Sequence, residues 1–403
     1  MSKPLSGIRI VEVAMWAFVP ACGGMLSDLG AEVIKIEPPT GDPLRGLRTA
    51  GVGDGTGPDL SWESYNRGKK SVTLDLKQPE GRDVLMHLVA EADVFLTNLL
   101  PPARVSLGID ADTICAKFPK IIYASGSGTG PNGPDASKGG YDAITFWARG
   151  GVSSSLTEDT ADYPVGPPGP AFGDTLSGAM LCGGICAAIA KRAMTGETSI
   201  VDVSLLGTAM WAMQRYIAQS TKDGNDRFPR PHDPKPNNVL VGNYRTSDGR
   251  YVSLCMLQAD KHWPGFCKAV GRPQWIEDPR YSDAASRREN LDACLADIKE
   301  LFAARPLADW RNILAQQAGP WDVVQNVGEL HKDKQVQANQ LVQTVDYGDG
   351  STIPLVAVPI LFNGTPMPAR RSPDLGAHSD EVLADLGYDE EAIIDLKVRG
   401  VVF

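Results

Sequence analysis

The sequence contains few residues of the kinds that bind metal ions. It has only five histidines, far apart along the chain, and no HExxH or H-x3-H pattern. Its seven cysteines include no C-x-x-C pair, and Cys182 and Cys186 lie in an apolar run, where thiols usually pack in the core. These absences predict a protein without a metal site, in a reducing cytoplasmic compartment.

Positive charge and long apolar runs are also scarce. Lysine and arginine number 39 against 49 aspartates and glutamates, a net charge of -10, so we expect no nucleic-acid partner. The longest uncharged runs, 13–27 and 175–190, are too short and too rich in glycine to predict a membrane span. The first residues contain no apolar signal core, so we expect no membrane association.

The first 125 residues contain an alternation of short β-branched runs and helical patterns. We expect strands at 8–13, 32–36, 71–76, 93–97 and 120–125, with helices from Pro20, from Pro79 and over 110–117. This order is typical of a largely parallel sheet covered by helices, an α/β fold.

The rest of the chain divides at a polar, proline-rich stretch over 222–238 that we interpret as a linker. Before it we expect helices over 142–148, 175–194 and 205–218 and a strand over 199–203. After it we expect a hairpin turning at Asp248-Gly249, helices over 261–270, 286–304 and 307–317, strands over 341–345 and 353–356, and a last helix over 380–386. The expected division is a large domain over 1–224, a small α+β domain over 225–330, and a return to the large domain over 331–403.

Three stretches dense in glycine and proline, 41–61, 126–140 and 153–173, are expected to be surface loops and functional candidates. The second contains Gly128-Thr-Gly-Pro-Asn-Gly133, which matches G-x-G-x-x-G. Pro131 and Pro134 prevent the helix that a dinucleotide site requires. Glu37 ends a strand, as in NAD-binding folds, but no glycine pattern precedes it. We therefore expect no NAD.

Asp174 is the most informative residue. It stands in Gly-Pro-Ala-Phe-Gly-Asp174-Thr-Leu-Ser-Gly, just before the nearly uncharged run, so we expect it at the start of an apolar helix. Free N–H groups and the helix dipole favour negative charge there, which predicts a carboxylate that is ionised at neutral pH, as a nucleophile must be. The alternative is that Asp174 only caps the helix.

Several segments together resemble the family III CoA-transferases. They are Pro4-Leu-Ser-Gly-Ile-Arg-Ile-Val-Glu-Val, Asp28-Leu-Gly-Ala-Glu-Val-Ile-Lys-Ile-Glu-Pro, Gly41-Asp-Pro-Leu-Arg45, Asn66-Arg-Gly-Lys-Lys-Ser-Val-Thr-Leu-Asp-Leu-Lys77, Ala92-Asp-Val-Phe-Leu-Thr-Asn98, Gly139-Gly-Tyr-Asp142 and Gly173-Asp174. This family, of CaiB/BaiF type, includes formyl-CoA:oxalate and carnitine CoA-transferases and the related α-methylacyl-CoA racemases. The resemblance covers essentially the whole chain.

The resemblance implies a large Rossmann-like domain built from both chain ends, a smaller inserted α+β domain, and a homodimer of interlocked chains. It implies that CoA moves from an acyl-CoA donor to a free carboxylic acid, with no cofactor beyond coenzyme A itself. Asp174 matches the family's nucleophile, which forms an acyl-aspartyl anhydride and then an aspartyl-CoA thioester. A closed apolar pocket would keep water from both.

The resemblance also implies a set of binding residues. The CoA contacts expected from it are Met15, Trp16, Ala17, Phe18, Leu74, Lys77, Asn98, Leu99, Arg104 and Leu107, with Arg104 about two residues early, and the expected acid contact is Tyr141. Taken alone, each has a plainer interpretation, such as a turn cap for Asn98, a surface charge for Lys77 and core packing for Trp16, Phe18 and Tyr141.

The sequence departs from the family pattern at Asn98-Leu-Leu-Pro-Pro102 and Phe18-Val-Pro20, and it lacks the glycine-run loop of the oxalate enzyme. Bulky Met15, Trp16 and Phe18 indicate an apolar acyl group larger than oxalate or formate. Two alternatives stay open. One is a racemase-like isomerase, although Tyr141 stands where the racemases have histidine. The other is an acyl-CoA binder without catalysis.

Overall fold

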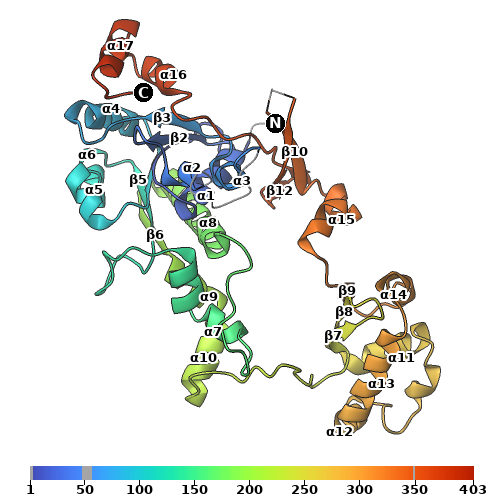
Figure 1. Ribbon diagram of the computed structural model, residues 1–403. Coiled ribbons are helices and arrows are strands. Elements are labelled where there is room, and N and C mark those ends of the chain that lie inside the picture. Colours follow the sequence, from blue (N-terminus) through green and yellow to red (C-terminus); the bar gives the residue numbers. More distant parts are fainter. Residues whose placement is uncertain (1–2, 48–56, 348–349) are drawn as a thin grey trace. The chain divides into compact units, whose positions relative to one another are not determined.

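The protein is described here by a computed structural model that covers residues 3–47, 57–347 and 350–403. The chain forms two compact units (Figure 1). The main unit consists of Met1–Arg230 and Gln335–Phe403, and the small unit of Pro231–Lys334.

A six-stranded parallel sheet is the centre of the main unit. Its strands are β1 (Arg9–Val13), β2 (Glu32–Glu37), β3 (Lys70–Thr73), β4 (Val94–Thr97), β5 (Ile122–Ser127) and β6 (Ile200–Ser204). Their order is β3-β2-β1-β4-β5-β6. In β1, Val11 lies opposite Ile34 of β2 and Phe95 of β4. The order reverses between β1 and β4, and this is the point where open α/β sheets bind ligands.

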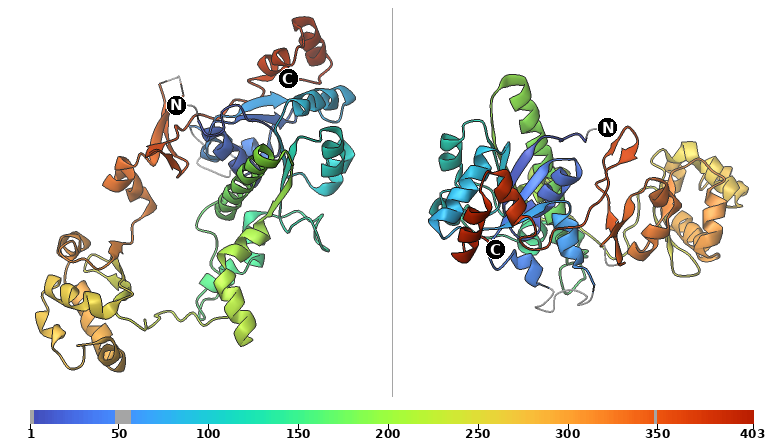
Figure 2. Two further views of the ribbon diagram at one scale, coloured as in Figure 1. Left: turned by 180° about the vertical axis from the view of Figure 1, so that it is seen from behind. Right: turned by 90° about the horizontal axis from the view of Figure 1, so that it is seen from above.

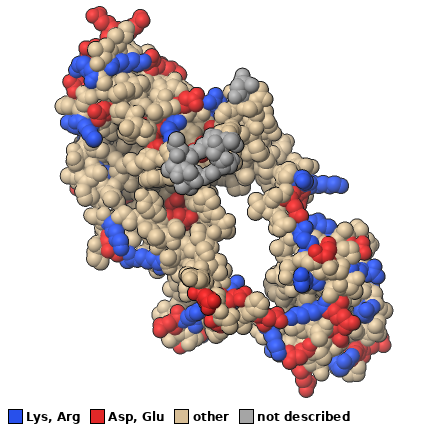
Figure 3. All heavy atoms as spheres, viewed as in Figure 1, with Lys and Arg blue, Asp and Glu red and all other residues tan. Residues whose placement is uncertain are grey.

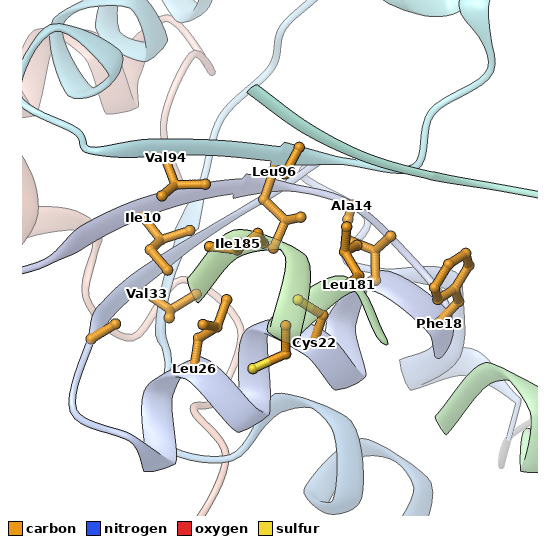
Figure 4. Packing of buried hydrophobic residues seen from close by; sticks show 14 of the residues in the cluster. Ile10, Ala14, Phe18, Cys22, Leu26, Val33, Val94, Leu96, Leu181 and Ile185 are labelled. Atoms are coloured by element: carbon orange, nitrogen blue, oxygen red, sulfur yellow. The ribbon is translucent and has the colours of Figure 1, made fainter. Parts of the chain in front are cut away.

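Helices cover both faces of this sheet. The helices in the first part of the chain, whether or not they cover the sheet, are α1 (Phe18–Asp28), α2 (Pro43–Gly46), α3 (Leu60–Asn66), α4 (Pro79–Ala90), α5 (Pro101–Leu107), α6 (Ala111–Lys117), the π-helix η1 (Asp142–Arg149), α7 (Val152–Leu156), α8 (Phe172–Thr195), α9 (Leu205–Ala212) and α10 (Gln214–Asp223). Buried side chains of β1, β2 and β4, such as Ile10, Val33 and Leu96, pack against Leu26 of α1 and Ile185 of α8 (Figure 4).

The last residues return to the sheet of the main unit. They form α15 (Lys334–Ala338), the hairpins β10 (Val342–Asp346) with β11 (Thr352–Val356) and β12 (Leu361–Phe362) with β13 (Thr365–Pro366), and the helices α16 (Ser379–Asp385) and α17 (Glu390–Val398). Helices α16 and α17 lie beside β3 and α4 (Figure 2), where Arg399 pairs with Glu80 and Tyr388 contacts His87. Both chain ends therefore contribute to one α/β layer structure.

The small unit is an α+β structure around its own core. A three-stranded antiparallel sheet, β7 (Val241–Arg245), β8 (Tyr251–Cys255) and β9 (Trp321–Val323), packs with α11 (Ala259–Ala269), η2 (Pro273–Ile276), α12 (Ala284–Glu289), α13 (Leu291–Ala303), α14 (Leu307–Leu314) and η3 (Val327–Lys332). Gly249 has φ 78°, as the expected Asp-Gly turn requires. On the face shown in Figure 3, acidic and basic side chains alternate over this unit instead of gathering by sign.

Helix α8 is longer than the sequence indicated, because it begins at Phe172 and runs for 24 residues. The helix is long and apolar enough to cross a membrane by length and composition alone, although the uncharged run 175–190 within it is shorter. Core helices of globular proteins pass the same test. The expected loop over 41–61 includes residues 48–56, which lie outside the described residues.

Candidate active site

A cavity of about 350 Å³ opens at the carboxyl ends of β1, β4 and β5, where the strand order reverses. Eight of the predicted site residues line it: Met15, Trp16, Phe18, Asn98, Leu99, Arg104, Tyr141 and Asp174. They come from four separate segments of the chain, so the fold brings together what the sequence places up to about 160 residues apart.

A second cavity of about 190 Å³ lies at the ends of β1, β2 and β3. The remaining predicted residues Leu74, Lys77 and Leu107 line it, and it shares Met15 and Leu99 with the first cavity. Ala17 is the exception, because it is buried just before α1 and lines neither cavity. The two cavities therefore adjoin at Met15 and Leu99, with Asp174 lining the first and Lys77 the second.

A larger cavity of about 410 Å³ lies in the small unit, but it contains none of the predicted residues. Its buried Arg287 is already paired with Asp260 and stacked over Trp263. Cavity size alone therefore does not identify the site. No cluster of three or more histidine, cysteine, aspartate or glutamate side chains suited to a metal ion occurs within the described ranges.

Asp174 lies in the first turn of α8 but does not cap it. The residue before the helix, Ala171, has φ 55° and no side-chain cap bond. The Gly173 N–H instead donates to Oδ1 of Asp142 at 3.0 Å. A side chain at position 173 would stand 2.2 Å from the Phe146 ring and 2.4 Å from the Asp142 carboxylate, so glycine is required there. The side chain that accepts an N–H group at the start of α8 is therefore that of Asp142, and not that of Asp174.

Burial and, to a smaller extent, the nearby Asp142 carboxylate raise the pKa of Asp174 to about 7. The expectation of a fully ionised carboxylate at neutral pH is therefore wrong. The helix terminus favours the anion, but removal of water and a second carboxylate disfavour it more. Burial also raises the pKa of Asp142, against the N–H groups of Gly173 and Phe172 that stabilise its charge.

The segment Ala14–Met15–Trp16 after β1 is fixed by side chains from other elements. Asn98 brackets Met15, accepting from its N–H at 3.0 Å and donating to its carbonyl at 2.6 Å. Oδ1 of Asp42 accepts the Trp16 N–H at 3.0 Å. Asn98 therefore does more than cap a turn, since both ends of its amide hold the wall of the cavity.

Trp16 has φ 68°, a left-handed conformation that is strained for a residue with a side chain. Its ring meets Tyr141 edge to face, with centroids 5.8 Å apart. Tyr141 is 55% exposed, so simple core packing does not describe it. In the loop before Tyr141, the backbones of Gly128 and Gly140 lie close together. An added Cβ at position 140 would lie only 2.7 Å from the Gly128 Cα, so this approach requires glycine.

The two cationic residues predicted to bind CoA, Lys77 and Arg104, differ in their exposure. The Lys77 side chain is exposed at the edge of the second cavity, and no described residue pairs with its ammonium group. Arg104 lies on α5, with Nη1 3.5 Å from the Tyr123 hydroxyl, while its buried Nε has no hydrogen-bond partner among the described residues. Both cations thus keep donors that a bound anion can use.

Sequence reasoning missed three residues of the site. Asp42 and Asp142 stand in the quoted segments Gly41-Asp-Pro and Gly-Tyr-Asp, but no role was derived for them. Tyr65 of α3 lies close enough to Asp174 and Asp142 for both carboxylates to raise its pKa, after the larger effect of burial. Only the Asx-type pattern at Asp42, just before Pro43, carried a local signal, and that signal predicted a cap.

Comparisons with known proteins agree with this geometry. The model of the family described as CoA-transferase family III matches residues 5–379. An (R)-2-hydroxy-4-methylpentanoate CoA-transferase of Clostridioides difficile is 35% identical, with 99% of each chain covered. A cinnamoyl-CoA:phenyllactate CoA-transferase of Clostridium sporogenes is 33% identical, with 97% of this chain and 95% of the relative covered.

A crystal structure of a CaiB/BaiF family protein from Brucella suis superimposes with a TM-score of 0.79 at 28% identity, covering 96% of this chain and all of that one. An orthorhombic crystal form of a Mycobacterium tuberculosis protein gives a TM-score of 0.80 at 26% identity, covering 94% of this chain and 99% of that one. The likeness therefore extends over both units of the chain.

Proposed function

The chain belongs to CoA-transferase family III, and we propose that it moves CoA from an acyl-CoA to a carboxylic acid through covalent intermediates on Asp174. The observation that carries this proposal is the position of Asp174. It is a carboxylate without a cationic partner among the described residues, and it lines the cavity at the switch point, where open α/β sheets commonly bind ligands.

The chemistry begins with ionised Asp174. One Oδ attacks the thioester carbonyl, a C–O bond forms, the C–S bond breaks, and CoA leaves as thiolate. The thiolate then attacks the Asp174 carbonyl carbon of the anhydride, which forms an aspartyl-CoA thioester and releases the donor acid. The acceptor carboxylate repeats both steps in reverse. Each intermediate stays activated, so no other energy source is needed.

The two cavities suit the two parts of CoA. We propose that the thioester end lies beside Asp174, against Met15, Phe18 and Leu99. The nucleotide end would then occupy the second cavity, where Leu74 and Leu107 supply apolar surface and Lys77 lies at the edge. Arg104, with its unpartnered buried Nε, is placed to bind a phosphate. Ala17 acts only through the backbone at the start of α1.

One observation bears on the isomerase alternative. A carboxyl with a pKa of about 7 next to a second carboxyl is also suited to proton transfer. Asp142, however, is already bonded to the helix N–H of Gly173, and position 141 is a tyrosine. An isomerase would exchange the α-hydrogen of a 2-methylacyl-CoA for deuterium from the solvent, whereas we expect no exchange.

Covalent trapping tests the proposal directly. Incubation with an acyl-CoA and hydroxylamine should convert Asp174 to its hydroxamate, which peptide mass spectrometry detects, and Asp174→Asn should give no adduct. Acceptor acid labelled with ¹⁸O should leave one label in the Asp174 carboxylate after turnover. Turnover without label in Asp174 contradicts the covalent scheme, and so does labelling at another residue.

We propose further that the enzyme is a cytoplasmic homodimer that needs neither metal nor NAD. Helix α8 exposes Leu176 and Met180, and the following α9 exposes Trp211, which is apolar surface that a second copy can cover. All seven cysteines are free, as in a reducing compartment. Light scattering should give twice the 43.1 kDa of one chain, and the mass of a single chain would contradict the dimer.

A further inference from the structure

The Asp174 cavity contains almost no positive charge. Among the described residues that line it, the single cation is Arg104 and the single anion is Asp174. Asp142, buried next to Asp174, adds a second negative charge nearby. An acid with a second carboxylate would lose water there, meet two carboxylates, and find one arginine that the proposed phosphate contact already uses.

The walls of the cavity are apolar and aromatic. Met15, Phe18, Leu99 and Leu205 line it, together with the edge-to-face pair of Trp16 and Tyr141. An alkyl or aryl side chain gains free energy from burial against such a surface, and aromatic edges add to it. The polar Asn98 does not change this balance, because both ends of its amide are bonded to Met15.

Trp16 is held in place by contacts that do not involve its indole. Its backbone N–H is bonded to Asp42, whose Oδ2 lies 2.9 Å from the buried Lys35 ammonium. Lys35 also donates to the Ala14 carbonyl at 2.8 Å. Because these groups are buried, the indole presents a preorganised wall instead of adapting to each substrate.

We propose that the enzyme selects monocarboxylic acids with a branched-alkyl or aryl side chain over dicarboxylic acids, and that Trp16 and Tyr141 determine this specificity. The inference rests on the proposed function, since the acid must reach Asp174. Donor acid and acceptor acid form the same kind of anhydride with Asp174. The selectivity therefore applies to the acyl group of the donor as well as to the free acid.

Binding to Asp174→Asn, saturated with CoA, tests the selectivity without any turnover, with the Asp142 charge and the apolar walls still in place. Calorimetry compares acids of similar length, 4-methylpentanoate against glutarate and 3-phenylpropanoate against adipate. We expect the apolar member of each pair to bind at least about tenfold more tightly. Equal or tighter binding of the dicarboxylates overturns the proposal, as does the absence of binding by both apolar acids at millimolar concentrations.

Variants of the two aromatic residues locate the selectivity. In the Asp174→Asn background, Trp16→Ala should weaken binding of 3-phenylpropanoate about tenfold and that of adipate less than about twofold, while Trp16→Phe should restore most of the loss. Tyr141 is largely exposed, so Tyr141→Ala should fold, and Tyr163→Ala, at an 84% exposed position, is its control. An unchanged preference in both Trp16→Ala and Tyr141→Ala overturns the assignment.

The two proposals fail in different ways. If transfer survives in Asp174→Asn, the covalent mechanism is wrong, but the binding preference can still stand. If Asp174 is labelled during turnover and glutarate binds as tightly as 4-methylpentanoate, the mechanism stands and the specificity is wrong. A dicarboxylate preference that disappears in Arg104→Met would assign specificity to Arg104 instead.

Discussion

The main unit contains two groups of acidic side chains that differ in their partners more than in their burial. Glu12 and Asp42 are fully buried and lie among lysines: Lys35 contacts both, and Lys69 lies 2.8 Å from Glu12. Asp142 is buried and Asp174 half-buried, and neither pairs with a cation in the part of the chain that the structure describes.

The difference separates a structural charge from a reactive one. Burial lowers the pKa of Lys69 to about 8, with Glu12 opposing it, whereas the carboxylates around Lys35 raise its pKa despite burial. The first group is thus a compensated network that fixes the segment after β1. In the second group no cation among the described residues offsets the charge, and the pKa of Asp174 is raised, as it is for perturbed groups at functional sites.

Asp174→Asn should show the largest effect on catalysis. If this variant stays active, the distinction between the two acidic groups is wrong. We expect kcat to fall by about 10⁴-fold or more, because the amide cannot form the proposed anhydride, while the variant stays folded and its CoA affinity stays near that of the wild type. Asp142→Asn is the matched variant. Its Oδ1 still accepts from Gly173, so its kcat should stay within about tenfold. Residual activity of Asp174→Asn within tenfold of the wild type contradicts the nucleophilic role.

Removing a carboxylate from the compensated network should mainly change stability. Glu12→Gln leaves Lys35 and Lys69 buried without their shared partner, and we expect a loss of about 3–5 kcal/mol in the free energy of unfolding. Denaturant titration measures it. Glu32→Gln is the control, because Glu32 pairs with Arg9 and Lys70 in a partly exposed position, where a change below about 1 kcal/mol is expected. Equal losses would mean that burial does not distinguish these pairs.

Replacing Asp174 should raise the free energy of unfolding, whereas replacing Glu12 should lower it. Its pKa is about 7 in the folded chain against a usual 3.8, so ionising it costs folding free energy. Wild-type stability should therefore fall as pH rises from about 4 through 7. Asp174→Asn removes this penalty and should be more stable than the wild type at pH 8, by up to about 4 kcal/mol, but not at pH 4. A pH-independent difference would show that Asp174 is ionised normally.

The smallest expected effect is a shift in the pH dependence of catalysis. In the proposed mechanism ionised Asp174 attacks the donor, so kcat/KM for the acyl-CoA should rise about tenfold per pH unit below 7 and level off above it. Asp142→Asn removes the neighbouring negative charge and should move the midpoint to lower pH. Initial rates over pH 5–9 measure both, and a midpoint near 4 in the wild type would contradict the raised pKa.

Local patterns were sufficient to predict most of the sheet and its helices. The strands are short β-branched runs, and Pro79 begins α4 as expected. Patterns failed where packing decides. The helix expected over 205–218 is interrupted at Met213, the one over 142–148 is a π-helix, and α5 was missed because Pro101-Pro102 resembles a breaker although proline suits the first turn.

Eight residues that line the Asp174 cavity could be singled out from the sequence, but the electrostatics of the site could not be predicted from it. Asp174 precedes an apolar run, so its place on a helix could be derived from neighbours in the sequence. Its pKa could not, because the surfaces that exclude water and the charge of Asp142 come from distant segments that only the fold brings together. The same holds for Asn98 and Asp42, whose partners Met15 and Trp16 lie 83 and 26 residues away.

The course of the segment after β1 is determined from outside, since Lys35, Asn98 and Asp42 bind its backbone and not its side chains. Any L-amino acid at position 16 would have to adopt the same left-handed backbone conformation as tryptophan. The identities of residues 15 and 16 are therefore separable from the path of the chain. A mutational library at these two positions can reshape the pocket while the scaffold stays intact, which makes this turn the natural place to retune substrate choice.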